Sequence, residues 1–255
     1  MNMNRDVYRQ TRIVRFYDKT KAGLTIPEEI CLDVVPLSYR GSILDIGIGA
    51  GRTTGPLAKQ FRNYIGIDYS PELIDAARIR YPNKNLQVMD ARKLDFDMQF
   101  DCVMFSFNGI DSVDYANRQI ILRQIAAVIK PGGYFIYSTH NLDYSRVVDW
   151  INRRWPNEIL LQRRQLLLRP WRQLMRIINR LKNFPRQTFG DVAGVAYVND
   201  PGLNFGLINT YVDIVKEIEM LQRHGLVNVI TVGNAKQSAL YDSSDNWVYI
   251  VARKH

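Results

Sequence analysis

Three aspartates follow short apolar runs, and a glycine-rich turn comes directly after the first of them. Asp45 precedes that turn, while Asp68 and Asp90 end the next two apolar runs. Carboxylates at successive strand ends can accept the hydroxyl hydrogens of a ribose and can contact further polar groups along the same crevice. The arrangement therefore favours a nucleoside-binding crevice over three unrelated helix-capping acids.

The turn differs from the dinucleotide-binding fingerprint GxGxxG. Glycines stand at Gly47, Gly49 and Gly51, but Arg52 occupies the place of the third fingerprint glycine. Glycines permit a tight turn and let a ligand approach the backbone closely. On its own the turn is also compatible with a structure that binds no ligand.

The elements that must position these residues alternate between strands and helices. We expect strands at 43–48, 64–67, 86–89, 101–105 and 134–138, with helices at 53–61, 71–81 and 117–129 between them. Ser70 and Pro71 form a typical helix start. This alternation predicts an α/β fold with a doubly wound, mostly parallel sheet. A helix at 209–224 and strands at 227–232 and 247–252 bring the expected sheet to seven strands.

The positive charge of the chain is concentrated in one segment. The net charge is +9, and residues 146–186 alone contain eleven basic and two acidic residues. We divide the chain into an N-terminal helical cap (1–40), an α/β core (41–141), a basic helical insertion or lid after the fifth strand (142–208) and a closing helix with two strands (209–255).

The insertion has apolar residues at helical spacing, including Trp171, Leu174 and Ile178, with arginines mostly on the other faces. One interpretation is a lid helix whose apolar side packs on the core. The other interpretations are a helix that lies on an anionic membrane surface, a helix that binds an acidic ligand, and a helix that contacts RNA phosphates.

Five motifs occur in order between residues 43 and 141: ILDIGIGAGR, YIGIDYSPELIDAAR, VMDAR, FDCVMFSFNGID and KPGGYFIYSTHN. Together they resemble the class I S-adenosylmethionine-dependent methyltransferases. The resemblance implies a Rossmann-like fold, S-adenosyl-L-methionine as the cofactor, and an enzyme that is a transferase. It does not cover the basic insertion.

The resemblance also implies roles for individual residues. It places the amino-acid end of the cofactor at Asp45 and the three glycines, the ribose at Asp68, and the adenine ring against Tyr69. It implies that Asp90 and Ala91 contact the polar edge of adenine. It also implies that the loop from Phe105 to Asn108 lines the path to the methyl group. Tyr17, in the N-terminal cap, either reaches the cofactor carboxylate or packs structurally.

The acceptor is not identified by these motifs. The loop Phe105-Ser106-Phe107-Asn108 stands where amide-methylating enzymes carry Asn/Asp-Pro-Pro-Tyr, which argues against DNA bases. The layout resembles quinone-biosynthesis O-methyltransferases, so we expect O- or N-methylation of a small organic or lipid-like acceptor. The alternatives are an RNA or protein methyltransferase that uses the basic insertion, or a non-catalytic cofactor-binding interaction module.

His140 follows the fifth strand at the same end of the sheet. A histidine near neutral pKa can remove a proton from a hydroxyl acceptor, so His140 is either the general base or a structural residue. Three scattered histidines and the two cysteines, Cys31 and Cys102, suggest neither a metal site nor a disulfide framework.

The sequence also predicts a location. It has no run of about 18 apolar residues, and its polar N-terminus lacks the apolar stretch of a secretion signal. We therefore expect a cytoplasmic protein, with a peripheral position at a membrane as one interpretation of the basic insertion.

Overall fold

The computed structural model describes residues 4, 7, 10, 21–144, 170–188, 194–199, 202–234 and 241–255. Tyr17 and residues 145–169 of the predicted insertion lie outside the described residues. The described part of the N-terminal cap contains helix α3 (Ile26–Asp33) and the short 3-10 helix η1 (Leu37–Tyr39).

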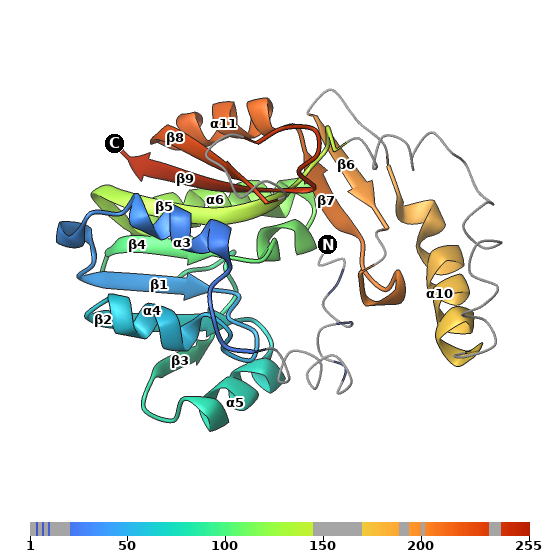
Figure 1. Ribbon diagram of the computed structural model, residues 1–255, viewed down its shortest axis with the longest axis horizontal. Coiled ribbons are helices and arrows are strands. Elements are labelled where there is room, and N and C mark those ends of the chain that lie inside the picture. Colours follow the sequence, from blue (N-terminus) through green and yellow to red (C-terminus); the bar gives the residue numbers. More distant parts are fainter. Residues whose placement is uncertain are drawn as a thin grey trace.

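A mixed sheet runs through the centre of the molecule, in the order β3-β2-β1-β4-β5-β7-β6 (Figure 1). Its first five strands are β1 (Ser42–Ile46), β2 (Asn63–Asp68), β3 (Asn85–Val88), β4 (Phe100–Phe105) and β5 (Ile129–Asn141). They pair in parallel, which confirms the doubly wound, mostly parallel prediction.

Two antiparallel strands close the sheet as expected. They are β8 (Leu226–Gly233) and β9 (Trp247–Lys254), and β9 also pairs with β5. The described residues form nine strands rather than seven, because β6 (Val195–Val198) and β7 (Asn209–Val212) extend the sheet beyond β5. The prediction of a helix from 209 was therefore wrong at its start: α11 (Ile214–Arg223) begins after β7, where Asp213 caps it.

Helices cover both faces of the sheet (Figure 1). On one face α6 (Tyr115–Val128) and α11 supply apolar side chains to the core. On the other face the apolar residues come from α3, α4 (Thr54–Gln60) and α5 (Pro71–Arg80). Ser70 caps α5 as predicted, since its side chain accepts a hydrogen bond from the backbone of Leu73.

The described part of the insertion contains a helix and a strand. Helix α10 (Pro170–Asn183) is followed by η3 (Phe184–Arg186) and β6, and a second 3-10 turn, η4 (Gly202–Asn204), precedes β7. The apolar side of α10 is exposed, with Trp171 at 70% and Leu181 at 58% of full exposure. The interpretation of a lid helix packed by its apolar side is therefore wrong for α10.

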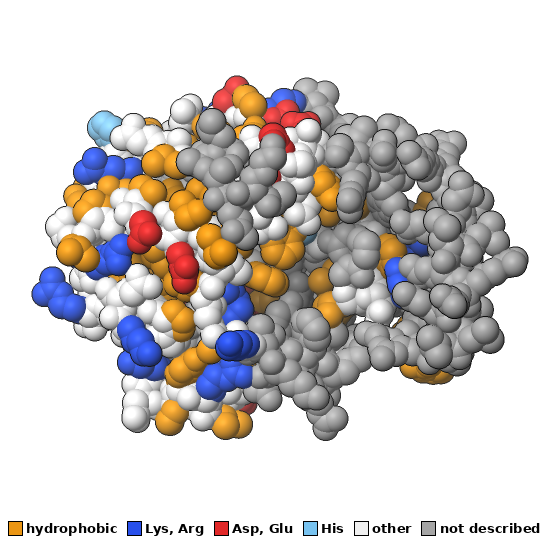
Figure 2. All heavy atoms as spheres, in the orientation of Figure 1, with side chains coloured by type: hydrophobic (Ala, Val, Ile, Leu, Met, Phe, Trp, Pro, Cys, Tyr) orange, Lys and Arg blue, Asp and Glu red, His pale blue; other side chains and the backbone are white. Residues whose placement is uncertain are grey.

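The core itself has no single basic patch on the face shown in Figure 2. Its described lysine and arginine side chains are scattered around the edge, with apolar and uncharged surface between them. This distribution agrees with the near-neutral charge that the sequence gives to the chain outside residues 146–186.

Candidate functional site

A crevice opens beyond the carboxyl ends of the first four strands. Seven of the predicted site residues line it: Gly47, Gly49, Asp68, Tyr69, Asp90, Ala91 and Phe105. Its other lining residues are Leu73, Arg92, Ser106, Phe107, Gly109, Ser112, Val113 and Ile121. Asp45, Gly51 and His140 are not among the lining residues.

The glycine turn has a backbone that side chains would distort. Gly47 has φ of 69°, and a Cβ there would lie 2.8 Å from the ring of Phe105. The backbone N–H groups of Gly47 and Ile48 both donate to the carbonyl of Ile67, at 2.8 and 3.2 Å. The turn is thus held against the end of β2, with its backbone facing the crevice.

Asp68 joins the tips of β1 and β2. Its Oδ2 accepts the backbone N–H of Gly49 and its Oδ1 that of Ser70, both at 2.9 Å. Burial raises the pKa of the Asp68 carboxyl to about 6, although these backbone hydrogen bonds oppose the shift. Two fixed oxygens with remaining lone pairs suit the paired hydroxyls of a ribose.

Asp90 is paired with Arg92, a residue that the sequence reasoning missed. The Arg92 Nη2 lies 2.5 Å from the Asp90 Oδ2, and the Arg92 backbone N–H donates to Oδ1 at 2.9 Å. Arg92 also donates to the side chain of Asn117 at the start of α6. Arg92 thus fixes the orientation of the Asp90 carboxylate, and the adenine contact predicted for Asp90 remains a prediction.

Asp45 supports the glycine turn without lining the crevice. It is 1% exposed, and its Oδ2 accepts the hydroxyls of Thr53 and Tyr64 at 2.6 and 2.8 Å. Burial raises the pKa of Asp45 to about 7 against the effect of these two hydrogen bonds. The described contacts of Asp45 therefore support the turn and the start of α4 rather than reach the crevice.

Arg52 links three segments around the crevice. Its guanidinium forms two hydrogen bonds with the fully buried Glu28 of α3, at 2.5 and 2.8 Å. It also donates to Ser106 in the loop after β4 and lies 4.9 Å from the ring centre of Phe107. Burial alone would raise the pKa of Glu28, but the hydrogen bond and charge of Arg52 hold it below its usual value.

A described residue of the N-terminal segment reaches the same end of the sheet. The Asn4 side chain accepts the backbone N–H of Ile208 at 3.0 Å and donates to the Ile208 carbonyl at 2.7 Å. It also donates to the carbonyl of Ser112, which lines the crevice, at 3.3 Å. Asn4 is thus attached beside the crevice.

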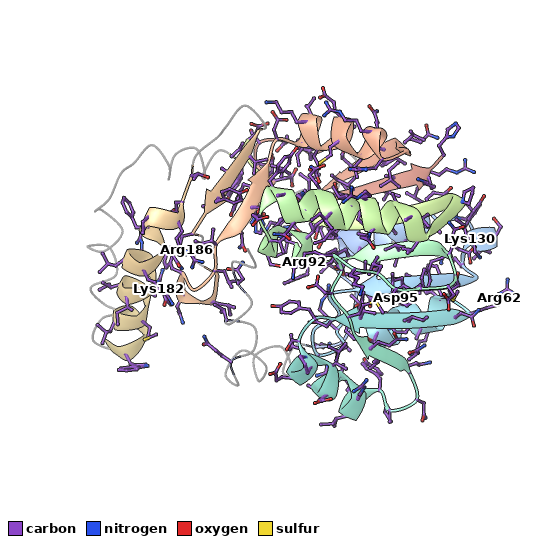
Figure 3. All side chains as sticks on the ribbon, turned by 180° about the vertical axis from the view of Figure 1, so that it is seen from behind. Arg62, Arg92, Asp95, Lys130, Lys182 and Arg186 are labelled. Carbon is purple, nitrogen blue, oxygen red and sulfur yellow. The ribbon has the colours of Figure 1, made fainter. Side chains whose placement is uncertain are left out.

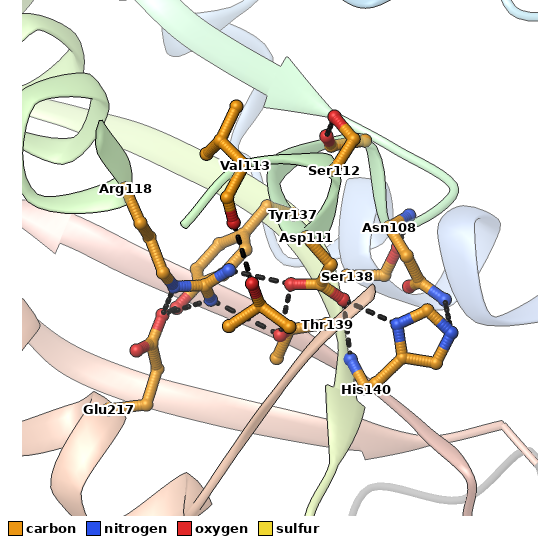
Figure 4. A network of polar contacts seen from close by, with 12 residues as sticks. Asn108, Asp111, Ser112, Val113, Arg118, Tyr137, Ser138, Thr139, His140 and Glu217 are labelled. Carbon is orange, nitrogen blue, oxygen red and sulfur yellow. Dashed lines mark hydrogen bonds and ion pairs between the residues drawn. The ribbon is translucent and has the colours of Figure 1, made fainter. Parts of the chain in front are cut away.

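His140 lies one loop away from the crevice, in a buried network (Figure 4). Because Tyr137 pairs with the last residue of β4, Phe105, the following residues of β5 project beyond β4. His140 Nδ1 there lies 2.7 Å from Asp111 Oδ2, and His140 Nε2 lies 3.4 Å from Asn108 Nδ2. A carboxylate only accepts hydrogen bonds, so Nδ1 carries a proton and Nε2 presents its lone pair toward Asn108.

The network continues behind the histidine through an arginine. Arg118 pairs with Asp111 at 2.6 Å and with Glu217 of α11, and all three side chains are essentially inaccessible to solvent. Asp111 also accepts the hydroxyl of Thr139 at 2.7 Å. These contacts fix the Asp111 carboxylate and, through it, the imidazole ring.

The loop between the crevice and His140 has a constrained backbone. Phe107 and Asn108 both have φ of 56°, in the left-handed region that non-glycine residues rarely adopt. The Asn108 Oδ1 is buried without a hydrogen-bond partner in the described structure. Constrained residues and an unsatisfied buried acceptor often mark ligand sites, and here both lie between the crevice and His140.

Metal binding and membrane spanning would each require a feature that the described residues do not show. Within the described ranges no group of three or more His, Cys, Asp or Glu side chains is arranged to hold a metal ion. Among the described helices, none combines the length and the apolar character needed to cross a bilayer.

Most of the α/β core matches one known family of protein domains. Residues 43–133 match the family model described as a methyltransferase domain. The matched residues include the glycine turn and the three aspartates at the strand ends.

Curated relatives match the same part of the chain. A fatty-acid O-methyltransferase of Mycolicibacterium smegmatis is 33% identical over 113 residues, which cover 42% of this chain and 40% of that protein. A ubiquinone biosynthesis O-methyltransferase of Coxiella burnetii is 33% identical over 106 residues, covering 40% of this chain and 44% of that protein. These matches span less than half the length of the relatives.

Solved structures resemble the whole chain in fold. The CcbJ methyltransferase from Streptomyces caelestis has a TM-score of 0.60 at 18% identity, covering 95% of this chain and 96% of that chain. The amino pentose methyltransferase CalS10 from Micromonospora echinaspora, solved with S-adenosylmethionine bound, has a TM-score of 0.56 at 16% identity, covering 96% and 97%. At these identities the likeness shows the fold alone.

Proposed function

Because this chain belongs to the class I S-adenosylmethionine-dependent methyltransferase family, we propose that it methylates a hydroxyl group of a small organic or lipid-like acceptor. When bound in the crevice, S-adenosyl-L-methionine would supply the methyl group for a direct in-line transfer to that hydroxyl. The observation that carries this proposal is the loop at 105–109, which lines the crevice on one side and contacts His140 on the other.

The crevice residues fit this cofactor. Asp68 has two fixed oxygens at the strand tip and accepts the ribose hydroxyls with lone pairs that Gly49 and Ser70 leave available. The apolar side chains of Leu73 and Ile121 provide walls for a flat adenine ring, beside Tyr69. When bound, S-adenosyl-L-methionine supplies an electrophilic sulfonium methyl group.

The same fit assigns the remaining predicted contacts. Asp90 and the backbone of Ala91 meet the polar edge of adenine, and the glycine turn faces the amino-acid end. Asp45 acts on this turn through Thr53 and Tyr64 rather than on the ligand. In this assignment Asp45 is a positioning residue.

His140 is the general base in this proposal. The acceptor hydroxyl would approach Nε2 in place of the Asn108 amide. Nε2 would take the hydroxyl proton while the oxygen bonds to the methyl carbon, the carbon–sulfur bond breaks and the thioether product leaves. Asp111 holds the proton on Nδ1 and stabilises the imidazolium that results. This pair favours a hydroxyl acceptor, because a neutral amine needs no proton removed before it attacks.

The surroundings of His140 support an apolar or aromatic acceptor. The Tyr211 ring lies 4.5 Å and the Trp247 ring 6.0 Å from the imidazole, and Phe107 lies 5.1 Å from Trp247, between ring centres. Two curated relatives are named as O-methyltransferases of fatty acids and of ubiquinone biosynthesis. Both names are compatible with a lipid-like acceptor for this chain.

The test combines a binding and an activity measurement. Calorimetry with S-adenosyl-L-homocysteine should detect binding that Asp68→Ala weakens. Isotope-labelled S-adenosyl-L-methionine should then transfer its methyl group to a hydroxylated aromatic or a hydroxylated lipid in a screen of acceptors. Transfer to amines alone would reject the hydroxyl preference, and a folded protein that binds neither form of the cofactor would reject the proposed function.

The alternatives are separate outcomes of the same screen. Methylation of RNA or of a protein, with no small molecule modified, would assign the chain to that class. Binding of S-adenosyl-L-methionine without transfer to any class of acceptor would indicate a cofactor-binding interaction module.

A further inference from the structure

Helix α10 contacts the rest of the described protein through its polar side. Four of its residues, spaced three and four apart, face the segment around Phe205: Arg176, Asn179, Arg180 and Asn183. Asn179 and Asn183 donate to the carbonyls of Asn204 and Phe205, both at 3.0 Å. The Arg180 guanidinium lies 4.6 Å from the centre of the Phe205 ring. The two arginines and two amides therefore form an attachment surface, which is unusual for an amphipathic helix.

The apolar side of the same helix is exposed. Its residues recur at helical spacing, and we call them the α10 apolar stripe: Trp171, Leu174, Ile177, Ile178 and Leu181. Their exposed fractions lie between 38% and 70%, and Phe184, directly after the helix, is 62% exposed. Soluble proteins seldom expose a contiguous apolar surface of this kind unless it binds a partner.

The position of α10 leaves this stripe accessible. The helix lies at one end of the molecule, beyond β6 and β7 and away from the parallel strands (Figure 1). It is attached at Asn204 and Phe205, on the segment between these two strands. The stripe is thus separate from the crevice.

The charge around the stripe has one sign. Residues 170–188 contain five basic side chains and no acidic one. Lys182 is exposed, and Lys182 and Arg186 both lie at the α10 end of the molecule (Figure 3). A partner that covers the stripe must therefore combine an apolar interior with negative charge at its edge.

We propose that the α10 apolar stripe binds the surface of an anionic lipid bilayer. In this position the helix lies in the plane of the interface, with Trp171, Leu174 and Ile178 among the acyl chains near the headgroups. Lys182 and Arg186 lie at the level of the anionic headgroups. Anionic lipids are enriched in the cytoplasmic leaflet. The proposal thus includes a cytoplasmic protein that is peripheral at the membrane.

Two other occupants fit the surface less well. A second copy of this chain, related by a two-fold axis, would bring the basic residues beside the two stripes close together, where their like charges repel. Nucleic acid would require arginines at the outer surface, whereas Arg176 and Arg180 lie against Phe205 and the outward side is apolar. A bilayer satisfies both the stripe and its flanking charge.

The proposal goes beyond the methyltransferase activity, because the stripe can bind a bilayer whether or not the chain methylates an acceptor. It gives a physical route to a lipid-like acceptor, which would otherwise have to leave the bilayer. The experiment can therefore follow bilayer binding and cofactor binding in the same samples.

Co-sedimentation of the full chain with vesicles tests the proposal. The protein should sediment with vesicles of phosphatidylcholine and phosphatidylglycerol, and at least about tenfold less with phosphatidylcholine alone. The double variant Leu174→Glu with Ile178→Glu should weaken binding to the anionic vesicles by at least about tenfold, because two apolar contacts are lost and negative charge is added. Both variant positions are exposed, so the fold should not change.

Ile79→Glu is the matched control. Ile79 lies on α5 and is 85% exposed, so this variant adds one of the double variant's two negative charges at an exposed apolar position outside the stripe. Binding of S-adenosyl-L-homocysteine should be equal in all three proteins. If the wild type sedimented with anionic vesicles but did not bind S-adenosyl-L-homocysteine, the proposed function would be rejected and the proposed membrane-binding surface would stand.

Three results would overturn the proposal. The first is no sedimentation of the wild type with anionic vesicles at low salt. The second is equal sedimentation of the wild type and the double variant. The third is a wild type that does not bind vesicles but forms a dimer in light scattering, or a complex with RNA, where the double variant forms neither.

Discussion

The Nδ1 atom of His140 lies 2.7 Å from Asp111 Oδ2, and the backbone N–H of His140 donates to the same oxygen at 2.7 Å. One carboxylate oxygen therefore determines both the position of the backbone at the end of β5 and the orientation of the ring. The ring nitrogen on the opposite side, Nε2, is left to face Asn108. This geometry gives the histidine a defined tautomer before any acceptor arrives.

His140→Ala should lower kcat by about 10²- to 10⁴-fold on a hydroxyl acceptor, because a positioned base contributes a factor of this size. The affinity for S-adenosyl-L-homocysteine should stay within about twofold, since His140 is not among the residues that line the crevice. Steady-state kinetics and calorimetry measure the two quantities. His224→Ala, at the end of α11, is the control. Full activity of the His140 variant would make the residue structural.

Asp68→Ala should weaken cofactor binding by at least about tenfold, because hydrogen bonds to a charged group contribute roughly 1.5–3 kcal/mol. Calorimetry with S-adenosyl-L-homocysteine measures the change, and circular dichroism checks the fold. Asp75→Ala removes a carboxylate from the neighbouring helix α5, where the side chain is 70% exposed, and should leave the affinity unchanged. Unaltered affinity in folded Asp68→Ala would exclude the ribose contact.

The core could be predicted from the sequence because its signals are local. Strands β1, β2 and β5 end at a glycine turn or a polar residue, and the helix caps, such as Ser70, are adjacent to the residues they cap. The short strands β6 and β7 were missed because they lack such local signals. Each has only four residues, in a segment without regular alternation. Their pairing, of β6 with β7 and of β7 with β5, forms only in the folded chain.

The site was predicted only where its residues share a motif. Asp68 and Asp90 stand at strand ends and line the crevice as expected. Asp111 contacts His140 from 29 positions away, and Arg52 contacts Glu28 from 24 positions away, so neither pair has a recognisable spacing. A local signal existed for Glu28, because Thr25 and Glu28 form a capping box at the start of α3.

Asp45 should make stability depend on pH. Burial raises the pKa of its folded-state carboxyl to about 7, well above the usual value for an aspartate. The folded state then holds a proton that the unfolded chain has lost, so this group's contribution falls as pH rises through that window. Between pH 5 and pH 8 the loss is on the order of 3 kcal/mol, at 1.36 kcal/mol for each unit.

The variant Asp45→Asn tests this effect, because an amide cannot ionise but can still accept a hydroxyl. Denaturant unfolding at pH 5 and pH 8 should show a smaller loss of stability in the variant than in the wild type. Glu28 and Arg52 also act on Asp45 through their charges and are present in both proteins, so their effects cancel in the comparison. Parallel pH profiles of the two proteins would contradict the raised pKa.

Glu28→Ala should destabilise the protein and weaken cofactor binding together. The substitution leaves the largely covered guanidinium of Arg52, 16% exposed, without its carboxylate partner, and breaking a buried pair on one side costs up to about 3–5 kcal/mol. Arg52 also contacts Ser106 and Phe107, so its displacement should disturb the loop that lines the crevice. Denaturant unfolding and calorimetry measure the two effects. Glu29→Ala, the next residue of α3, is exposed and should change neither. If Glu28→Ala lost stability but kept full cofactor affinity, the ion pair would support α3 alone and the crevice loop would be held independently.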